Sequence, residues 1–121
     1  MKLAIKITVG GCRDFNDSEY IFKCLDEYIK ELCDEEIIII SGHCSGVDAI
    51  AEKYAEIKGF ETVIFPAEWD KYGRAAGPAR NKKMVEASDI VIAFWDEKSK
   101  GTKSLINLAK KSDKSIKIYK I

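Results

Sequence analysis

The sequence lacks the short motifs that mark the commonest dinucleotide, metal and redox sites. It contains neither GxGxxG nor GxxxxGK[ST], although residues 98–102 (KSKGT) are similar in composition to a phosphate loop. These absences weaken the interpretation as a dinucleotide-dependent dehydrogenase or a P-loop protein. The four cysteines form no CxxC pair, which does not favour a zinc knuckle or a thioredoxin-like motif. We therefore expect four free thiols, in a reducing cytoplasmic environment.

The chain also lacks an excess of charge of either sign and any long hydrophobic run. A formal net charge of zero argues against a dedicated nucleic-acid binder. Residues 97–121 nevertheless carry eight lysines against Glu97 and Asp113. We interpret them as a solvated face, with a partner site as the alternative. The run IIII at 37–40 is too short to span a bilayer, and residues 1–9 do not resemble a signal peptide. We expect no membrane partner.

What is present is a regular alternation of strand-like and helix-like segments. Five β-branched runs lie at 3–9, 37–41, 61–66, 89–95 and 115–121, with helical patterns between them. This order predicts one α/β domain over residues 1–121, a three-layer sandwich whose five-stranded, mostly parallel sheet has helices on both faces. The last run alternates apolar and charged residues, which places it at an edge of the sheet.

The helical segments have recognisable ends. An apolar stripe recurs at helical spacing over residues 20–32, and another over 47–55 is ended by Gly59 as a left-handed cap. Pro78 suits the first turn of a third helix, and the last helix opens near Gly101. Residues 67–77 are expected to form a long loop, and long loops within compact domains are usually functional.

Polar, glycine-rich segments follow each of the first four strands. They lie at residues 10–15, 41–48, 66–80 and 96–102. The carboxyl ends of parallel strands meet at one edge of a sheet, where ligands bind in open α/β folds. Each segment also leads into a helix, whose first amide groups are unpaired and attract anions. This convergence predicts a site for an anionic ligand at that edge.

The arginines are few and their positions are selective. Only three are present, against seventeen lysines, and all three lie in these loops: Arg13, Arg74 and Arg80. A guanidinium group is a planar, forked donor that matches phosphate and carboxylate groups. We therefore expect arginine at the ligand site.

Several of these residues have simpler explanations. The glycines could serve only tight turns, the serines Ser41 and Ser45 could cap a helix, and Asp48 could interact only with the helix dipole. Trp69 and Tyr72 could form a small core under the loop or a wall that stacks on a base. A metal site made of His43, Cys44 and Cys12 is a weaker hypothesis, and we predict no resident metal.

Four segments carry a family resemblance: GGCRDF, SGHCSGVDAIAEKYA, PAEWDKYGRAAGPARNKKM and FWDEKSKGTKSLI. Together they resemble the YspA/YpsA-related group of the SLOG superfamily, which includes lonely-guy phosphoribohydrolases and the DNA-processing protein DprA. The resemblance covers nearly the whole chain in the right order. It implies a Rossmann-like fold that binds a nucleotide or nucleotide-derived ligand at a glycine-rich crevice, and it is consistent with a homodimer.

The resemblance also assigns positions in this chain. Arg80 and Met84 correspond to an R-x-x-x-M pattern, and residues 99–102 to a phosphate-binding Gly-Thr turn. Residues 41–48 match S-G-x-x-x-G-x-D, except that a second glycine usually stands where this chain has His43. Taken with the loop positions, it gives the expected ligand-binding residues as Gly10, Gly11, Arg13, Asp14, Ser41, Gly42, Gly46, Asp48, Trp69, Arg80, Asn81, Ser99, Gly101 and Thr102.

One departure from the resemblance concerns catalysis. Lonely-guy enzymes carry a glutamate two residues after the threonine of the Gly-Thr turn, and this chain has Ser104 there. Cleavage of an N-glycosidic bond calls for a carboxylate, for which Asp48 and Glu68 are weak candidates. Whether the protein is an enzyme therefore stays open.

The leading hypothesis is a binding or sensing domain for a nucleotide-derived molecule. The alternative is an N-glycosidic hydrolase acting on a nucleoside monophosphate or an ADP-ribose-like substrate. A third hypothesis, binding of single-stranded nucleic acid, is less favoured because few aromatic residues lie near the C-terminal lysines. No cofactor is predicted, although Asp14, Asp48 and Asp96 leave open a Mg²⁺ ion bridged to phosphates.

Overall fold

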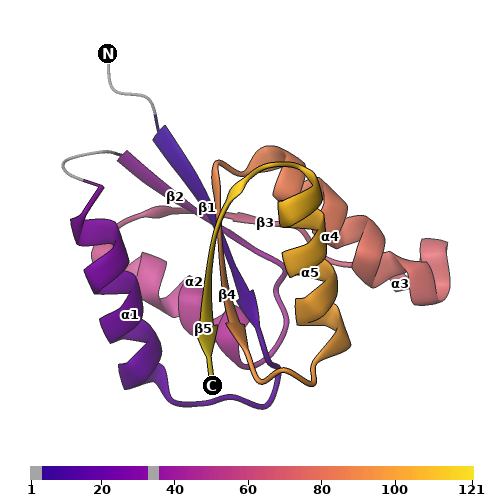
Figure 1. Cartoon of the computed structure of the whole chain (residues 1–121), viewed down its shortest axis with the longest axis horizontal. Helices are drawn as coiled ribbons and strands as arrows, with labels where there is room; N and C mark the ends of the chain where they lie inside the picture. Colours follow the sequence, from indigo (N-terminus) through magenta and orange to yellow (C-terminus); the bar gives the residue numbers. More distant parts are fainter. Residues whose placement is uncertain (1–3, 33–35) are drawn as a thin grey trace.

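The computed structural model describes residues 4–32 and 36–121, so that Leu3 and Cys33 of the sequence predictions lie outside the described residues. A parallel sheet forms the middle layer and helices cover both of its faces (Figure 1). The strands are β1 (Ala4–Gly11), β2 (Glu36–Ser41), β3 (Glu61–Ile64), β4 (Ile90–Trp95) and β5 (Ser115–Lys120). The helices are α1 (Ser18–Lys30), α2 (Val47–Lys58), α3 (Trp69–Tyr72), η1 (Gly73–Ala75), α4 (Ala76–Ala87) and α5 (Lys100–Lys111).

The sheet has the strand order β3-β2-β1-β4-β5, and every pairing in it is parallel. The predicted α/β architecture is therefore confirmed, as is the edge position of β5. Residues 90–94 of β4 and residues 7–10 of β1 are buried, whereas β5 has only exposed and half-buried residues, as expected at an edge. At the other edge, β3 is short and largely exposed.

Each face of the sheet has its own hydrophobic core. On the face covered by α1 and α2, Ile7, Ile39 and Phe94 pack with Leu25 and Tyr54. On the face covered by α4 and α5, Ile40 and Val91 pack with Met84 and Leu105. The alternation of side chains along each strand sends neighbouring residues of one strand to opposite cores. Within the described ranges, every helix is too short or too polar to cross a bilayer.

The ends of the helices follow their sequence signals. Asp17 accepts a hydrogen bond from the amide of Tyr20 at the start of α1, at 3.1 Å. Gly59 ends α2 with φ of 76°, as a left-handed cap. Pro78 lies in the first turn of α4, where its missing N–H leaves no hydrogen bond unmade.

The expectation of a long loop over residues 67–77 is wrong. This segment contains α3 and η1 and leads directly into α4. The amides of Lys71 and Tyr72 both donate to the carbonyl of Glu68, at 3.1 and 3.0 Å, so local hydrogen bonds fold it into helical turns. The segment projects beyond the rest of the molecule, at the far right of Figure 1.

Candidate functional site

A pocket of about 540 Å³ lies where the strand order reverses, between the carboxyl ends of β1 and β4. The loops after β1, β2 and β4 supply its floor and walls, together with the first turns of α4 and α5. The predicted residues that line it are Gly10, Gly11, Arg13, Asp14, Asp48, Trp69, Arg80, Asn81, Ser99, Gly101 and Thr102.

Three predicted residues lie behind the pocket wall. The hydroxyl of Ser41 is buried and donates to Glu52 Oε2 at 2.7 Å, and the carbonyl of Gly42 accepts from Arg80. Gly46 has φ of 72°, and a Cβ at this position would collide with the carbonyl oxygens of Cys12 and Arg13. A glycine is required there because two loops of the site meet backbone to backbone. These three residues support the site without lining it.

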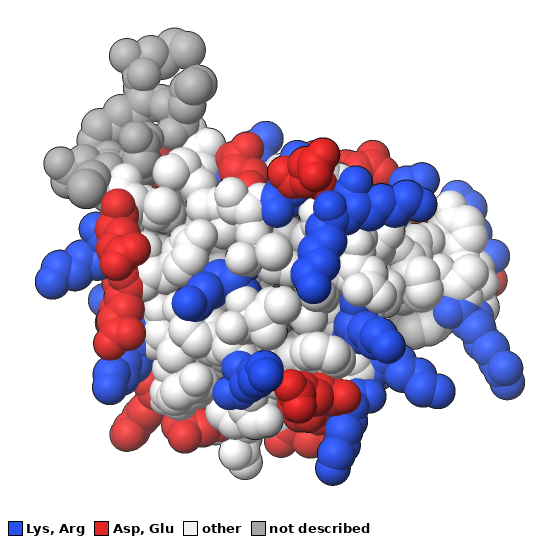
Figure 2. Space-filling model, in the orientation of Figure 1, with Lys and Arg blue, Asp and Glu red and all other residues white. Residues whose placement is uncertain are grey.

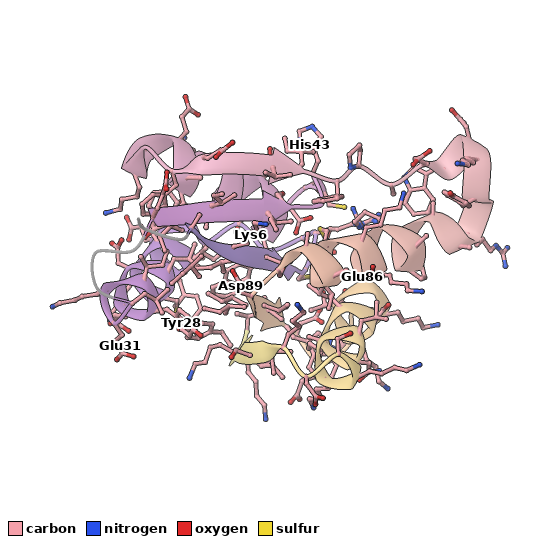
Figure 3. All side chains as sticks on the ribbon, turned by 90° about the horizontal axis from the view of Figure 1, so that it is seen from above. Lys6, Tyr28, Glu31, His43, Glu86 and Asp89 are labelled. Carbon is pink, nitrogen blue, oxygen red and sulfur yellow. The ribbon has the colours of Figure 1, made fainter. Side chains whose placement is uncertain are left out.

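His43 also lies outside the pocket. It adopts φ of 60°, a left-handed conformation that glycine reaches more readily. Its Nδ1 lies 3.0 Å from Glu52 Oε1, and its ring points outward at the upper edge of Figure 3. The histidine therefore does not line the pocket.

Arg80 is a fixed part of the pocket wall, with only 8% of its surface exposed. Its Nη1 donates to the carbonyl of Gly42 at 2.7 Å, and its Nε donates to Asn81 Oδ1 at 3.0 Å. Nη2 donates to the sulfur of Cys44 at 3.8 Å and to no oxygen or nitrogen acceptor among the described residues. Asn81 in turn donates to the carbonyl of Gly101 at 3.2 Å. The guanidinium group thus ties the loop after β2 to α4, and Asn81 ties α4 to α5.

Asp48 places a carboxyl group at the bottom of the pocket, 5% exposed. It accepts from the amide of Cys44 at 3.3 Å and from the amide of Gly11. Burial raises the pKa of Asp48, and these amides and the charge of Arg80 oppose the shift only in part. Among the described residues, no cation forms an ion pair with this carboxylate.

The turn between β4 and α5 presents backbone amides to the pocket. Asp96 Oδ1 accepts from the amides of Lys98 and Ser99, at 2.9 and 2.7 Å, which lowers the pKa of this carboxyl. Ser99 caps α5 by accepting from Thr102. The amides of Lys100 and Gly101 have no acceptor in the part of the chain that the structure describes. They are therefore free to bind an anion.

Four cationic side chains surround this opening: Arg13, Arg74, Lys98 and Lys100. None of the four makes an ion pair or side-chain hydrogen bond within residues 4–32 and 36–121. Lysine and arginine side chains project from the right-hand part of the face in Figure 2, over α3, α4 and α5. With Arg80, five basic residues thus line the pocket against the three carboxylates Asp14, Asp48 and Asp96.

The two aromatic residues of α3 face different hollows. Trp69 lines the main pocket and is 50% exposed, whereas Tyr72 lines a smaller hollow of about 200 Å³ with Pro66 and Glu68. Neither residue is buried as a core residue would be. Glu68, a weak catalytic candidate, does not line the main pocket, and lies 3.7 Å from Lys83.

The pocket also contains residues outside the predicted ligand-binding set. Arg74 could have been included, because arginine is so scarce in this chain. Most of the others lie in the loops predicted to form the site or, like Met84, in the R-x-x-x-M pattern, whereas Leu105 carries no such signal and only the fold brings it to this edge. These additional residues are Cys12, Cys44, Arg74, Gly77, Pro78, Met84, Asp96, Lys98, Lys100, Ser104 and Leu105.

The positions of the candidate metal ligands and of the cysteines bear on metal and thiol chemistry at the site. Within the described ranges, no group of three or more His, Cys, Asp or Glu side chains could hold a metal ion. Cys12, Cys24 and Cys44 are free thiols, and Cys12 Sγ lies 3.5 Å from Asp96 Oδ2.

Comparison with known proteins gives one family and several structures. The sequence profile of the YspA, cpYpsA-related SLOG family matches residues 5–72, which is more than half of the chain. The chain is also 26% identical over 113 residues to the Gene 61 protein of Mycobacterium phage D29, covering 88% of this chain and 90% of that protein.

Three solved structures share the fold. DprA from Streptococcus pneumoniae superposes with a TM-score of 0.73 at 20% identity, covering 94% of this chain. The structural-genomics target TM1055 gives 0.68 at 15% identity, covering 93% of this chain and 72% of its own. DprA from Helicobacter pylori gives 0.63 at 21% identity, covering 94% and 64%. The chain spans 50% of the S. pneumoniae protein's length. These likenesses confirm the Rossmann-like fold.

Proposed function

Because the chain belongs to the YspA, cpYpsA-related SLOG family, we propose that its pocket binds a nucleotide or a nucleotide-derived molecule that carries phosphate. The observation that carries this proposal is the set of unpaired cations around the opening. Four cations that form no ion pair among the described residues converge there with two unpaired amides, and with Arg80 they make five basic residues against the lining carboxylates Asp14, Asp48 and Asp96. An anionic ligand with several oxygens satisfies these cations and amides.

The shape of the pocket orients such a ligand. The phosphate lies at the start of α5, against the amides of Lys100 and Gly101, with Arg13 and Arg74 closing on it. Trp69 offers a half-exposed indole on which a base stacks. Arg80 contributes through Nη2, since its other nitrogens already hold the protein together.

The first test is a thermal-shift screen of the purified protein against AMP, ADP, ATP, NAD, ADP-ribose, cyclic nucleotides and ribose 5-phosphate, with and without Mg²⁺. A ligand at 100 times its Kd stabilises the folded state by about 2.7 kcal/mol, which raises the midpoint of unfolding clearly. The absence of any shift across this panel would contradict the proposal.

A pair of lysines on α5 provides matched variants. Lys100 lines the pocket and Lys103, three residues further along the same helix, does not. We expect Lys100→Gln to weaken nucleotide binding by severalfold at low salt, because it removes a charge beside the phosphate. Lys103→Gln removes the same charge on the same helix, and equal losses in the two variants would argue against a local contact.

Gly101 allows a test of phosphate binding in which a loss of binding cannot be attributed to misfolding. A Cβ at this position would meet nothing within 4 Å, and the residue lies within α5. We expect Gly101→Ala to leave stability unchanged or to raise it by about 0.5–1 kcal/mol. If phosphate contacts the amide of Gly101, the added methyl group obstructs it and the ligand-induced thermal shift falls. Unchanged binding would move the phosphate away from this turn.

The second candidate is N-glycosidic hydrolysis, favoured by the position of Asp48. Its carboxyl group lies in the pocket. Chromatographic detection of free adenine from AMP or of nicotinamide from NAD would support it, provided that Asp48→Asn abolishes the release. Binding without any release leaves the protein as a sensor or carrier of its ligand.

Single-stranded nucleic acid is the third candidate, because the H. pylori DprA structure is described by its single-stranded DNA binding mode. Fluorescence anisotropy with a labelled oligonucleotide tests it, and binding of this kind weakens steeply with salt. Oligonucleotide binding that mononucleotides do not displace would favour this candidate over the pocket proposal. A homodimer also stays a prediction, which sedimentation velocity can test.

A further inference from the structure

Asp48 is a buried carboxylate that lines the pocket, and the charge of the Arg80 guanidinium acts on it without an ion pair between the two among the described residues. Its surface is 5% exposed, and its acceptors receive two backbone amides and no ion pair among the described residues. Burying an ionised carboxylate is unfavourable unless hydrogen bonds satisfy its oxygens. Each carboxylate oxygen accepts two hydrogen bonds, so two amides leave capacity for further donors.

Gly10 fixes the place of this carboxylate relative to the phosphate-binding turn. A Cβ on Gly10 would lie 3.8 Å from Asp48 Oδ1 on one side and 2.8 Å from Leu105 Cδ2 on the other. Leu105 lies four residues, about one helical turn, after Gly101 on α5. Leu105 occupies the space over Gly10, so a ligand group that reaches Asp48 lies in the pocket beside Gly10 and Leu105, next to the turn that faces the phosphate.

In a nucleotide, the group joined directly to the phosphate is the ribose. The base lies beyond the sugar, on the side where Trp69 stands. The donors that reach Asp48 from beside Gly10 are then hydroxyl groups of the sugar, and two vicinal hydroxyls match the two oxygens of a carboxylate.

We infer that Asp48 accepts hydrogen bonds from the vicinal hydroxyls of a ribose, and that it makes the pocket selective for ribonucleotides over deoxyribonucleotides. This inference rests on the proposed function and adds the identity of the sugar to it. The same selectivity disfavours DNA as the occupant of this pocket, because DNA lacks the 2′-hydroxyl.

The experiment compares matched ligands on the unmodified protein. Whichever nucleotide binds in the screen is titrated by calorimetry beside its 2′-deoxy and 3′-deoxy forms. Ribose 5-phosphate and 2-deoxyribose 5-phosphate provide the same comparison without a base. Loss of one hydrogen bond to a charged acceptor corresponds to a weakening of roughly tenfold or more.

Two variants connect the selectivity to the carboxylate. In Asp48→Asn, we expect weaker binding of the ribonucleotide and a deoxy-to-ribo ratio of Kd values that falls toward one. Asp113→Asn serves as the control, because Asp113 is exposed, lies after α5 and has φ of 55°, which asparagine tolerates. Denaturant unfolding of each variant shows whether it is folded. The deoxynucleotide comparison on the parent protein does not depend on any variant.

The outcomes separate the two proposals. Equal Kd values for the ribo and deoxy forms overturn the role of Asp48 and leave nucleotide binding intact. A ribo preference that persists in Asp48→Asn assigns the selectivity to another residue and also overturns this inference. If no nucleotide binds at all, the proposed function fails and the inference fails with it.

Discussion

The two faces of the sheet are built for different purposes. The face covered by α1 and α2 has the larger core, with stacked and edge-on aromatic contacts among Tyr20, Tyr54 and Phe94 and their neighbours. The face covered by α4 and α5 has a smaller core, and two of its members, Met84 and Leu105, also line the pocket. The first face therefore buries the larger apolar core, while side chains of the second core also line the pocket.

The sharpest test of this division is a pair of core substitutions. Leu25 is fully buried in the α1 and α2 face. We expect Leu25→Ala to lower the free energy of unfolding by about 2–5 kcal/mol. The Kd for the nucleotide should stay within about twofold of the parent value, because the cavity opens far from the pocket. Urea unfolding and calorimetry measure the two effects.

Met84→Leu is the counterpart on the other face. This swap conserves volume and changes stability by less than about 1.5 kcal/mol. It alters the pocket wall, so we expect it to weaken nucleotide binding, which is measured as a higher Kd. If Leu25→Ala weakened binding as much as Met84→Leu does, the two faces would not be independent.

A smaller change in the free energy of unfolding is expected when the contact between α1 and α2 is altered. The buried hydroxyl of Tyr54 donates to Asp26 Oδ1 at 2.7 Å, which lowers the pKa of Asp26. Tyr54→Phe removes this hydrogen bond, and we expect a loss of about 1 kcal/mol at neutral pH. A carboxyl whose pKa is lower in the folded state contributes stability above its unfolded pKa and loses it as the pH falls through the folded pKa. The difference between parent and variant should therefore shrink in acid.

Lys58 provides the control for that contact. Its ammonium group lies 3.1 Å from Asp26 Oδ1, but both side chains are largely exposed. Exposed pairs of this kind contribute little, so Lys58→Met should change stability by less than about 0.5 kcal/mol. A larger effect for Lys58→Met than for Tyr54→Phe would mean that the ion pair holds the two helices together.

How much of this was predictable depends on the range of the interactions involved. The order of strands and helices followed from local periodicity, and the location of the pocket from the loops after the strands. The turns of α3 and η1 were missed because four-residue helices have too few residues to show a period. The sequence could also not reveal that Arg80 uses Nη1 on the carbonyl of Gly42, a contact between residues 38 positions apart.

Asp48 connects the two faces of the sheet, because it lies on α2, which covers one face, and its side chain lines the pocket. Its pKa is raised by burial, so it contributes stability below the unfolded pKa of a carboxyl and loses that contribution as the pH rises through the folded pKa. At neutral pH the charged form is therefore less favourable in the folded protein than in the unfolded chain. We expect Asp48→Asn to raise the free energy of unfolding at neutral pH by up to about 1 kcal/mol, as removal of a destabilised functional group often does.

The gain should disappear below the ordinary pKa of aspartate, where the parent carboxyl is neutral in both states. Urea unfolding at several pH values measures it. A variant that is more stable and yet binds nucleotide less well would show that the charge of Asp48 serves the ligand at the expense of the fold. A variant that is less stable at every pH would instead show that the main role of Asp48 is to accept the hydrogen bonds of the Cys44 and Gly11 amides. Helix α2 would then contribute to stability and not to ligand binding.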